Sequence, residues 1–391
     1  MDLASFELLF TPLGNKALDF AQQLQPREED YLRHFQLMER QFTKELAQAA
    51  LETAILRDKA RPKFPHAEQM YFTRESLEQA SPHQVSEYRS KRFQHCKYLL
   101  DLGCSIGSDT IQLANHAYTT GLDTDPLRLA MAQANIRALN LSDQVSFVRA
   151  DLRATLPFSS PAATGLFFDP ARRRADRRVF SIQDYQPPLE ILRDWLPIHP
   201  AIGVKISPGV KLAEITAFDA ELEFISLQGE LKEAALWFGT LKTTPRRATI
   251  LPGPHTLIGG EPDQPLPIDE PLDYLYEPDP AIIRAGLVYE LGKQLGASQV
   301  DADIAYLSSE QRTETPFARA WQVESWFPFS LKRLRTYLRE RRVGEITVKK
   351  RGSPLQPEEL IRRLRLAGEG RRVVFLTHLE GAPIVIVCFS P

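Results

Sequence analysis

The chain has 391 residues, more than one hydrophobic core usually holds, so we expect two or three domains. Hydrophobic residues make up 43% and charged residues 25%, as in ordinary globular proteins, and no apolar run is long enough to cross a membrane. The three cysteines and eight histidines show no disulfide or metal-ligand spacing, which predicts no metal site and a reducing, cytoplasmic compartment.

The first segment, residues 1–95, is predicted to be helical. Apolar residues recur at helical spacing between residues 29 and 59, and two prolines mark a connection over 61–65. Thr73 and Ser81 are candidate helix caps, the second because Pro82 suits a first helical position. We expect this region to pack beside the active site of the next domain, with or without touching the substrate.

Strands and helices alternate over residues 96–251. This order predicts a mostly parallel sheet with helices on both faces, and a final hairpin around Gly229. The expected strands are 98–102, 117–122, 145–148, 165–168 and 201–206, the helices are 126–139 and 189–196, and the hairpin arms are 223–227 and 233–238.

The C-terminal part reads as a linker and two small modules. Residues 252–271 are rich in Pro, Gly and Asp and are expected to form the linker. We predict a small α+β, ferredoxin-like module over 272–325 and a second α+β module over 326–391. The expected elements are a helix from 280 to 295, a strand at 304–307, helices at 331–342 and 358–366, and strands at 345–349, 372–377 and 383–389.

A strand, a glycine-containing turn and a helix follow one another between Tyr98 and Leu113. Asp101, Gly103, Ser105 and Gly107 stand at every second position from the end of the strand through the turn. An ordinary strand-to-helix turn has the same glycines. The stretch also resembles motif I of the class I S-adenosylmethionine (SAM) methyltransferases, acid-x-Gly-x-Gly-x-Gly, with Ser105 at the middle glycine. The resemblance implies a Rossmann-like sheet that binds SAM against Asp101, Gly103, Ser105 and Gly107.

Four predicted strands each end in an aspartate. These residues are Asp101, Asp123, Asp151 and Asp169. Ligands of open α/β sheets bind at the carboxyl ends of the strands, where such acids can accept hydrogen bonds. Helix capping explains any one of them, and four in succession less well. By the same resemblance, Asp101 would hold the methionine end of SAM through water or directly, Asp123 would hold the ribose hydroxyls, and Asp151 with the Leu152 backbone would hold the adenine. NAD is the rival ligand.

The fourth strand is followed by Asp169-Pro170-Ala171-Arg172. This group resembles motif IV of the amino-methyltransferases, (Asp/Asn)-Pro-Pro-aromatic, in which a carboxylate and a backbone carbonyl orient the target amine. The resemblance makes Asp169, Pro170 and Arg172 the catalytic candidates, although Ala171 and Arg172 depart from the motif. Candidate substrate contacts nearby are Arg173, Tyr185 and Lys205; a core tyrosine and a solvated lysine are the simpler alternatives for the last two.

Positive charge is concentrated near the C-terminus. Residues 331–372 contain 14 Lys and Arg against 5 acids, although the whole chain has a net charge of −2. Such an asymmetry is typical of a surface that binds a polyanion, and a solvated helix face is the alternative. Residues 326–332 and 348–352 resemble a THUMP-like domain of a bacterial methyltransferase family, which implies an RNA partner (tRNA or rRNA). The candidate RNA contacts are Lys332, Arg335, Lys349, Lys350 and Arg351.

Together these patterns predict a SAM-dependent methyltransferase that modifies an exocyclic base nitrogen of RNA, with guanine N2 as the first choice. One alternative is a methyltransferase of small molecules or proteins. The other is an RNA-binding protein that senses SAM without catalysis.

Overall fold

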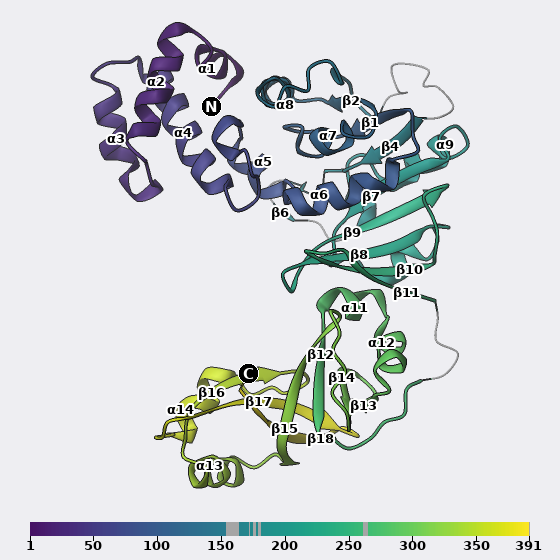
Figure 1. Ribbon diagram of the computed structural model, residues 1–391. Helices are drawn as coiled ribbons and strands as arrows, with labels where there is room; N and C mark the ends of the chain where they lie inside the picture. Colours follow the sequence, from purple (N-terminus) through teal and green to yellow (C-terminus); the bar gives the residue numbers. More distant parts are fainter. Residues whose placement is uncertain (154–163, 172, 175–176, 179–180, 261–264, 391) are drawn as a thin grey trace. The chain divides into compact units, whose positions relative to one another are not determined.

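The computed structural model describes residues 1–153, 164–171, 173–174, 177–178, 181–260 and 265–390 (Figure 1). It divides into two compact units, the first formed by residues 1–222 and 232–243 and the second by residues 223–231 and 244–391. The predicted helical region and most of the predicted methyltransferase domain therefore belong to the first unit, whereas residues 223–231 and 244–251 of that domain belong to the second unit with the two predicted C-terminal modules.

The N-terminal region is helical, as predicted. Polar caps start several of its helices: Asp2, Thr11, Thr43 and Thr73 each accept a hydrogen bond from a backbone N–H in the first turn. The helices are α1 (Leu3–Leu8), α2 (Pro12–Gln23), α3 (Tyr31–Met38), α4 (Lys44–Ala60), α5 (Arg74–Gln79) and α6 (His83–Ser90).

One local prediction in this region was wrong. The stretch 29–59 is helical as expected and forms two helices, with Thr43 capping α4 after α3 has ended at Met38. Ser81 is not a helix cap: its hydroxyl donates to the carboxylate of Glu233 at 3.0 Å, and α6 begins after Pro82.

A single apolar core joins these helices to the sheet that follows. Phe6, Met38 and Leu56 lie in the same buried cluster as Ile106 and Met131, from the glycine-rich turn and helix α8 (Pro126–Ala138). Burial of apolar surface is the main stabilising term in a core of this kind. The N-terminal helices are therefore part of the first unit's core, and do not form a separate domain.

The sheet of the first unit has the predicted Rossmann-like order. Its strands run β3-β2-β1-β4-β7-β9; the first five are parallel and β9 is antiparallel to β7. The strands are β1 (Tyr98–Leu102), β2 (Tyr118–Asp123), β3 (Val145–Arg149), β4 (Thr164–Phe168), β7 (Ala201–Ile206) and β9 (Glu230–Gly239). Helix α7 (Ser108–Leu113) follows β1. Because β1 is parallel to both β2 and β4, the carboxyl ends of these three strands lie at one edge of the sheet.

The second unit contains more strands than the sequence indicated. The predicted linker 252–271 includes strand β11 (His255–Gly259), which pairs with β10 (Arg246–Leu251), a neighbour of β8 (Glu221–Leu227). The helix expected from 280 to 295 is two helices, α11 (Pro280–Ala285) and α12 (Val288–Leu295), because Gly286 takes a left-handed conformation with φ of 73°.

One seven-stranded sheet runs through both predicted C-terminal modules. Its order is β13-β14-β12-β15-β18-β17-β16. The long strand β15 (Ala318–Pro328) crosses the predicted boundary at 325/326, because it pairs with β12 (Tyr274–Pro278) along one part and β18 (Ala382–Phe389) along the other. The ferredoxin-like prediction for 272–325 is also wrong, since helices connect only one pair of strands there, β12 and β13 (Ser298–Asp301), before β14 (Ile304–Ser309).

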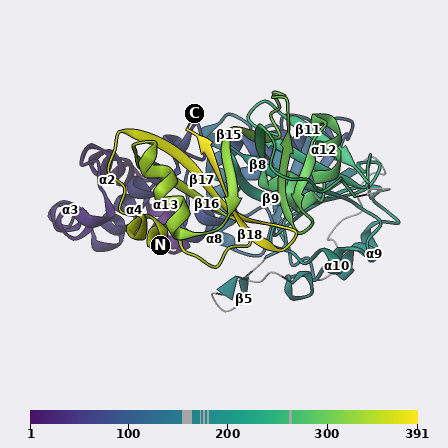
Figure 2. The ribbon, with the colours of Figure 1, turned by 90° about the horizontal axis from the view of Figure 1, so that it is seen from below.

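Two helices cover one face of this sheet. Leu334 and Leu338 of α13 (Leu331–Glu340) and Leu360 and Leu364 of α14 (Pro357–Leu364) share a buried cluster with β16 (Val343–Lys350), β17 (Gly370–Leu379) and β18. Figure 2 shows α13 beside these strands. Basic residues of these helices are exposed, among them Lys332, Arg339, Arg362 and Arg363, and the Arg333 guanidinium lies 4.4 Å from the ring centroid of Phe327.

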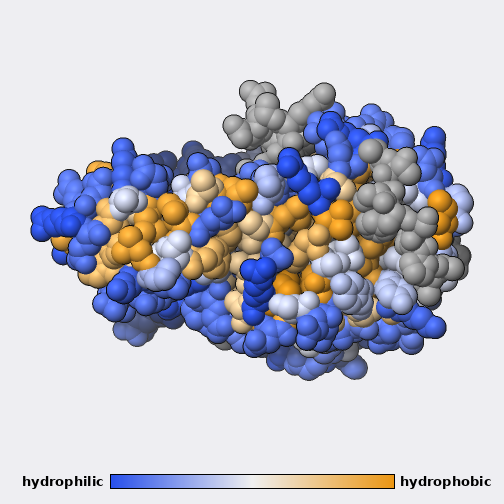
Figure 3. All heavy atoms as spheres, turned by 90° about the horizontal axis from the view of Figure 1, so that it is seen from above, coloured by the Kyte–Doolittle hydropathy of each residue, from blue (hydrophilic) through white to orange (hydrophobic). Residues whose placement is uncertain are grey.

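The surface of the first unit carries apolar side chains as well as charged ones (Figure 3). Leu8, Phe10, Leu13 and Leu32, from the N-terminal helices and their connections, are among the exposed large hydrophobic residues. Individual exposed apolar side chains are common on folded proteins. Within the described part of the chain, no helix combines the length and the hydropathy that a membrane span needs.

Candidate functional site

A pocket of about 560 Å³ lies at the carboxyl ends of β1, β2 and β4 in the first unit. Most of the predicted cofactor and catalytic residues line it, together with residues of the N-terminal region such as Lys63 and Gln79. The predicted residues among the lining are Gly103, Ser105, Asp123, Asp151, Leu152, Asp169, Pro170 and Lys205. The structure thus brings together side chains that are more than 100 positions apart in the sequence.

The turn after β1 is held against β2 and β4 by its backbone. Gly103 has φ of 87°, and a Cβ atom there would lie 2.7 Å from the carbonyl oxygen of Asp169. Ser105, at the middle glycine position, has φ of 49°, and its backbone N–H donates to Asp123 Oδ2 at 2.9 Å. Gly103 therefore permits a close approach of β1 to β4, and the Asp123 carboxylate fixes the turn.

Gly107 begins helix α7 and does not line the pocket. Its φ is 81°, and a Cβ atom there would lie 3.3 Å from the Cβ of Ala132 in α8. Its role in the structure is thus to start the helix and to let α8 pack closely.

Asp101 lies behind the pocket wall rather than in it. Its side chain is 1% exposed, Oδ2 accepts a hydrogen bond from Thr110 at 2.5 Å, and the buried Oδ1 has no hydrogen-bond partner. Burial, with the nearby charge of Asp109, raises the pKa of Asp101 to about 8. The predicted hold on the methionine end of SAM is therefore not direct, and Asp101 positions the start of α7.

Asp151 and Leu152 form another part of the lining. Leu152 is buried, whereas Asp151 is exposed and forms an ion pair with Arg153 at 2.6 Å. Hydrogen bonds from the side chain and backbone of Arg153 lower the pKa of Asp151 to about 2. Asp151 is therefore a carboxylate at neutral pH and can accept hydrogen bonds from a ligand.

Asp169 and Lys205 form an ion pair that lines the pocket. The Lys205 ammonium donates to Asp169 Oδ2 at 2.6 Å and contacts the carbonyl oxygen of Gln79 at 3.4 Å. The Lys205 side chain is only 3% exposed, so it is not the solvated lysine that the sequence left open. The backbone N–H of Asp169 donates to Leu102, which ties the end of β4 to β1.

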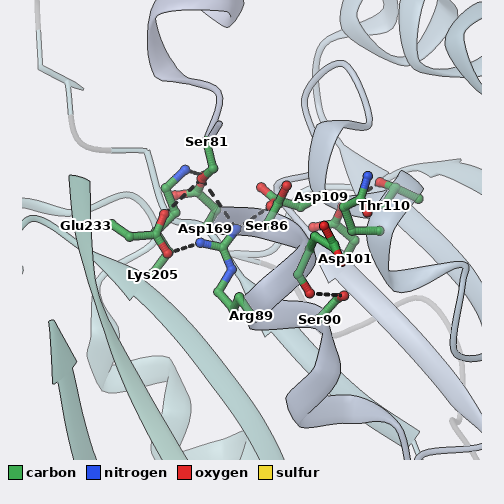
Figure 4. A network of polar contacts seen from close by, with 12 residues as sticks. Ser81, Ser86, Arg89, Ser90, Asp101, Asp109, Thr110, Asp169, Lys205 and Glu233 are labelled. Atoms are coloured by element: carbon green, nitrogen blue, oxygen red, sulfur yellow. Dashed lines mark hydrogen bonds and ion pairs between the residues drawn. The ribbon is translucent and has the colours of Figure 1, made fainter. Parts of the chain in front are cut away.

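A second group of charges lies buried next to this pair (Figure 4). Arg89 of α6 forms ion pairs with Asp109 of α7 and Glu233 of β9, and its guanidinium lies 4.4 Å from the ring centroid of Phe167. Burial alone would lower the pKa of Arg89, but the two carboxylates raise it above its ordinary value. One signal in the sequence could have indicated this group: Glu233 is an acid at the start of a predicted apolar strand. A carboxylate that is buried there needs a partner of opposite charge.

Two predicted substrate contacts, Tyr185 and Arg173, and the catalytic candidate Arg172 are not among the described residues that line the pocket. Tyr185 is 1% exposed, and its hydroxyl accepts a hydrogen bond from the backbone N–H of Ser207 at 2.9 Å, so it is a core tyrosine. Arg172 lies outside the described residues. Arg173 belongs to the short strand β5 (Arg173–Arg174), which pairs with β6 (Arg177–Arg178).

The five predicted RNA contacts divide into two groups. Lys349 and Arg351, around the end of β16, face Glu277, and Arg351 also lies 4.8 Å from the ring centroid of Tyr306. Lys350 donates to the side chain of Gln356. Lys332 is exposed, and Arg335 donates to the carbonyl oxygen of Arg363 at 2.6 Å.

Comparisons with known proteins agree with this geometry. Residues 99–168 match the family described as a methyltransferase domain, residues 318–389 match the THUMP domain-like family, and residues 2–60 match a domain of unknown function. An uncharacterized S-adenosylmethionine-dependent methyltransferase of Mycobacterium tuberculosis, found in strains CDC 1551 / Oshkosh and ATCC 25618 / H37Rv, is 34% identical over 340 residues, 84% of this chain and 92% of the relative. The chain belongs to the S-adenosylmethionine-dependent methyltransferases.

A solved structure shows the same fold over most of the chain. A Porphyromonas gingivalis W83 protein, provisionally assigned as a methyltransferase, superposes with a TM-score of 0.74 at 24% identity, covering 93% of this chain and 98% of that one. The Rossmann-like class I fold predicted from the sequence is confirmed, together with the C-terminal THUMP-like domain.

The cofactor of this methyltransferase is SAM, and the pocket suits it. SAM offers hydrogen-bond donors from its ammonium, ribose hydroxyls and adenine amine, and the pocket offers the carboxylates of Asp123, Asp151 and Asp169. A volume of about 560 Å³ lies within the usual range of ligand sites. Within the described residues, no cluster of three or more His, Cys, Asp or Glu could hold a metal ion.

We expect Asp123→Ala to weaken SAM binding at least tenfold, about 1.4 kcal/mol, because a charged acceptor is lost from the pocket. Isothermal titration calorimetry measures the affinity. Asp125→Ala is the control, since Asp125 caps α8 without lining the pocket. It should lower stability and change SAM affinity less than about threefold. Equal effects of both variants would contradict a direct contact of Asp123 with the cofactor.

Asp101 should make the stability of the protein depend on pH. Its carboxyl ionises near pH 3.8 in the unfolded chain and near 8 in the fold, so unfolding releases a proton between these values and the free energy of unfolding falls as pH rises. The free energy of unfolding of the wild type should therefore fall between about pH 5 and about pH 8, whereas that of Asp101→Asn should not. The difference in favour of the variant should grow across this range. Urea unfolding at both pH values tests this, with exposed Asp143→Asn as the control. The same change in free energy of unfolding between the two pH values in Asp101→Asn and in the wild type would refute the raised pKa of Asp101.

Proposed function

We propose that this methyltransferase transfers a methyl group to an exocyclic amine of a base in RNA, with guanine N2 as the first candidate. The observation that carries the proposal is the position of Asp169 and Pro170. Both line the same pocket as Asp123 and the glycine-rich turn, so the acceptors for a target amine lie next to the acceptors for the cofactor.

Asp169 has one oxygen available for the target amine. Oδ2 accepts from Lys205, and within the described part of the chain Oδ1 has no hydrogen-bond donor. When bound, SAM supplies an activated methyl group, and the amine attacks it with its lone pair. A carboxylate that accepts an N–H of the amine orients this lone pair, stabilises the positive charge that develops on nitrogen, and can take up the proton that nitrogen loses.

The THUMP-like domain supports RNA as the substrate. In its described part, α13 and α14 form a basic patch that consists of Lys332, Arg335, Arg339, Arg362, Arg363 and Arg365. The two helices are adjacent, because Arg335 donates to the carbonyl of Arg363, and Arg339 to that of Arg365 at 2.9 Å. Cations clustered on neighbouring helices suit a phosphate backbone.

A cytoplasmic location remains part of the proposal. Cys96, Cys104 and Cys388 are all free thiols, and Cys104 and Cys388 are buried. Unpaired cysteines are typical of proteins in a reducing compartment.

We expect Asp169→Ala to lower methyl transfer at least about a hundredfold while SAM affinity stays within about threefold of wild type, because the orienting acceptor is lost. The assay measures labelled methyl transfer from SAM to total RNA, followed by nucleoside analysis. Gln186→Ala, which removes another side chain of the pocket lining, is the control and should retain most of the activity.

Label in a methylated guanosine that disappears in Asp169→Ala would support both the substrate and the catalytic residue. Turnover retained in Asp169→Ala would remove this residue from the mechanism. SAM binding without transfer to RNA by the wild type would instead favour a protein or small-molecule substrate, or a SAM sensor.

The basic patch should bind RNA in a salt-dependent manner. Lys332→Gln with Arg362→Gln removes two exposed cations, neither of which has an acidic partner among the described residues, and should reduce the slope of log affinity against log salt by about two. Fluorescence anisotropy with labelled tRNA at several salt concentrations measures the slope. Lys16→Gln, an exposed lysine of α2, is the control. The same slope in the double variant and the wild type would place RNA binding elsewhere.

A further inference from the structure

Lys205 is a charged residue in an otherwise apolar buried strand. All six residues of β7, Ala201–Ile206, are buried, and Lys205 is the only charged one. Burying an ammonium group is costly unless hydrogen bonds and an opposite charge compensate for it. The ion pair with Asp169 compensates in part, and it places the ammonium in the pocket lining.

The Lys205 ammonium has one N–H donor more than its contacts use. An ammonium carries three N–H donors. Among the described residues it has two acceptors, Asp169 Oδ2 at 2.6 Å and the carbonyl of Gln79 at 3.4 Å. Among the same residues Asp169 Oδ1 has no hydrogen-bond donor. The pair thus presents one acceptor and one donor side by side to the pocket.

This arrangement complements a particular edge of a nucleobase. In adenine, cytosine and the N2/N3 edge of guanine, the exocyclic amine sits on a ring carbon next to an unprotonated ring nitrogen. The amine can donate to Asp169 while the ring nitrogen accepts from Lys205. Paired contacts of this kind discriminate strongly, because an edge without the acceptor leaves a buried donor unsatisfied.

We propose that Lys205 reads the ring nitrogen beside the target amine, and so selects bases that carry an amine next to such an acceptor. In guanine, the N2 amine would donate to Asp169 while N3 accepts from Lys205. The opposite side of the amine would be rejected, because N1 carries a hydrogen and cannot accept. The identity of RNA as the substrate rests on the proposed function above, but the pairing of Lys205 with a ring nitrogen can be tested without RNA.

Lys63 provides a matched control. It lines the same pocket, and its ammonium donates to the carbonyls of Leu77 at 2.6 Å, Glu78 at 3.1 Å and Ala80 at 3.2 Å. All three of its donors are therefore used within the protein. Removing Lys63 changes the charge of the pocket as removing Lys205 does, but it removes no donor that is available to a base.

The experiment compares two probes on the full chain saturated with S-adenosylhomocysteine. One is 2-aminopyridine, with an amine beside a ring nitrogen, and the other is aniline, which has a C–H group at that position. Ligand-observed NMR at mildly alkaline pH, where 2-aminopyridine is neutral, gives both affinities. We expect the wild type and Lys63→Met to prefer 2-aminopyridine about tenfold, and Lys205→Met to lose the preference. Lys205→Arg, which keeps N–H donors, should retain part of it.

The outcomes separate this inference from the proposed function. No preference in the wild type, or a preference that survives in Lys205→Met, overturns the role of Lys205, and thermal melts show whether each variant is folded. Methyl transfer to total RNA is measured in parallel, and we expect at least a tenfold loss in Lys205→Met with SAM affinity unchanged. If RNA accepts no methyl group from the wild type, RNA is the wrong substrate, and the probe comparison still decides the role of Lys205.

Discussion

The site depends on the burial of Arg89 between two carboxylates. Arg89 comes from α6, Asp109 from α7 and Glu233 from β9, so one guanidinium joins the N-terminal helices, the helix after the glycine-rich turn and the antiparallel strand. Removing one partner from such a cluster typically costs about 3–5 kcal/mol, because the remaining charge stays buried and unpaired. The N-terminal helices are therefore part of the catalytic architecture, and this explains why pocket-lining residues such as Lys63 and Gln79 come from them.

The charges in and behind the pocket do not balance. Arg89 and Lys205 are surrounded by Asp101, Asp109, Asp169 and Glu233 (Figure 4). The fold reduces the excess of negative charge at Asp101, because burial and the nearby charge of Asp109 outweigh the effect of Arg89 and raise the pKa of Asp101 to about 8. Burial, only partly offset by Arg89, also raises the pKa of Asp109. Within this buried group the carboxylates of Asp109, Asp169 and Glu233 still outnumber the cations Arg89 and Lys205, whereas the wider pocket lining also contains Lys63, Arg128, Arg153 and Lys232.

Much of the first unit could be predicted from the sequence, because its signals are local. Apolar strands that each end in an acid, with helices between them, indicated the sheet and its ligand-binding edge. What the sequence could not show was which charges meet in space. For Tyr185 the sequence left open a stacking role or a core position, and the side chain lies in the core; for Lys205 it left open a substrate contact or a solvated lysine, and the side chain is buried. The second unit was predicted less well, because β15 is one strand with different partners at its two ends, and pairing over such distances leaves no local signal.

The C-terminal charge illustrates the same limit. Counting residues 331–372 gave a large positive excess, but two acids outside that window neutralise part of it: Glu277 faces Lys349 and Arg351, and Glu324 pairs with Arg341 and Arg372. The cations of β16 thus help to hold the sheet together. The positive charge left for a polyanion lies mainly on α13 and α14, whose opposite faces are fixed by Leu334, Leu338, Leu360 and Leu364 against the sheet. Cations held on two packed helices in this way suit contacts to a phosphate backbone, as the proposed function requires.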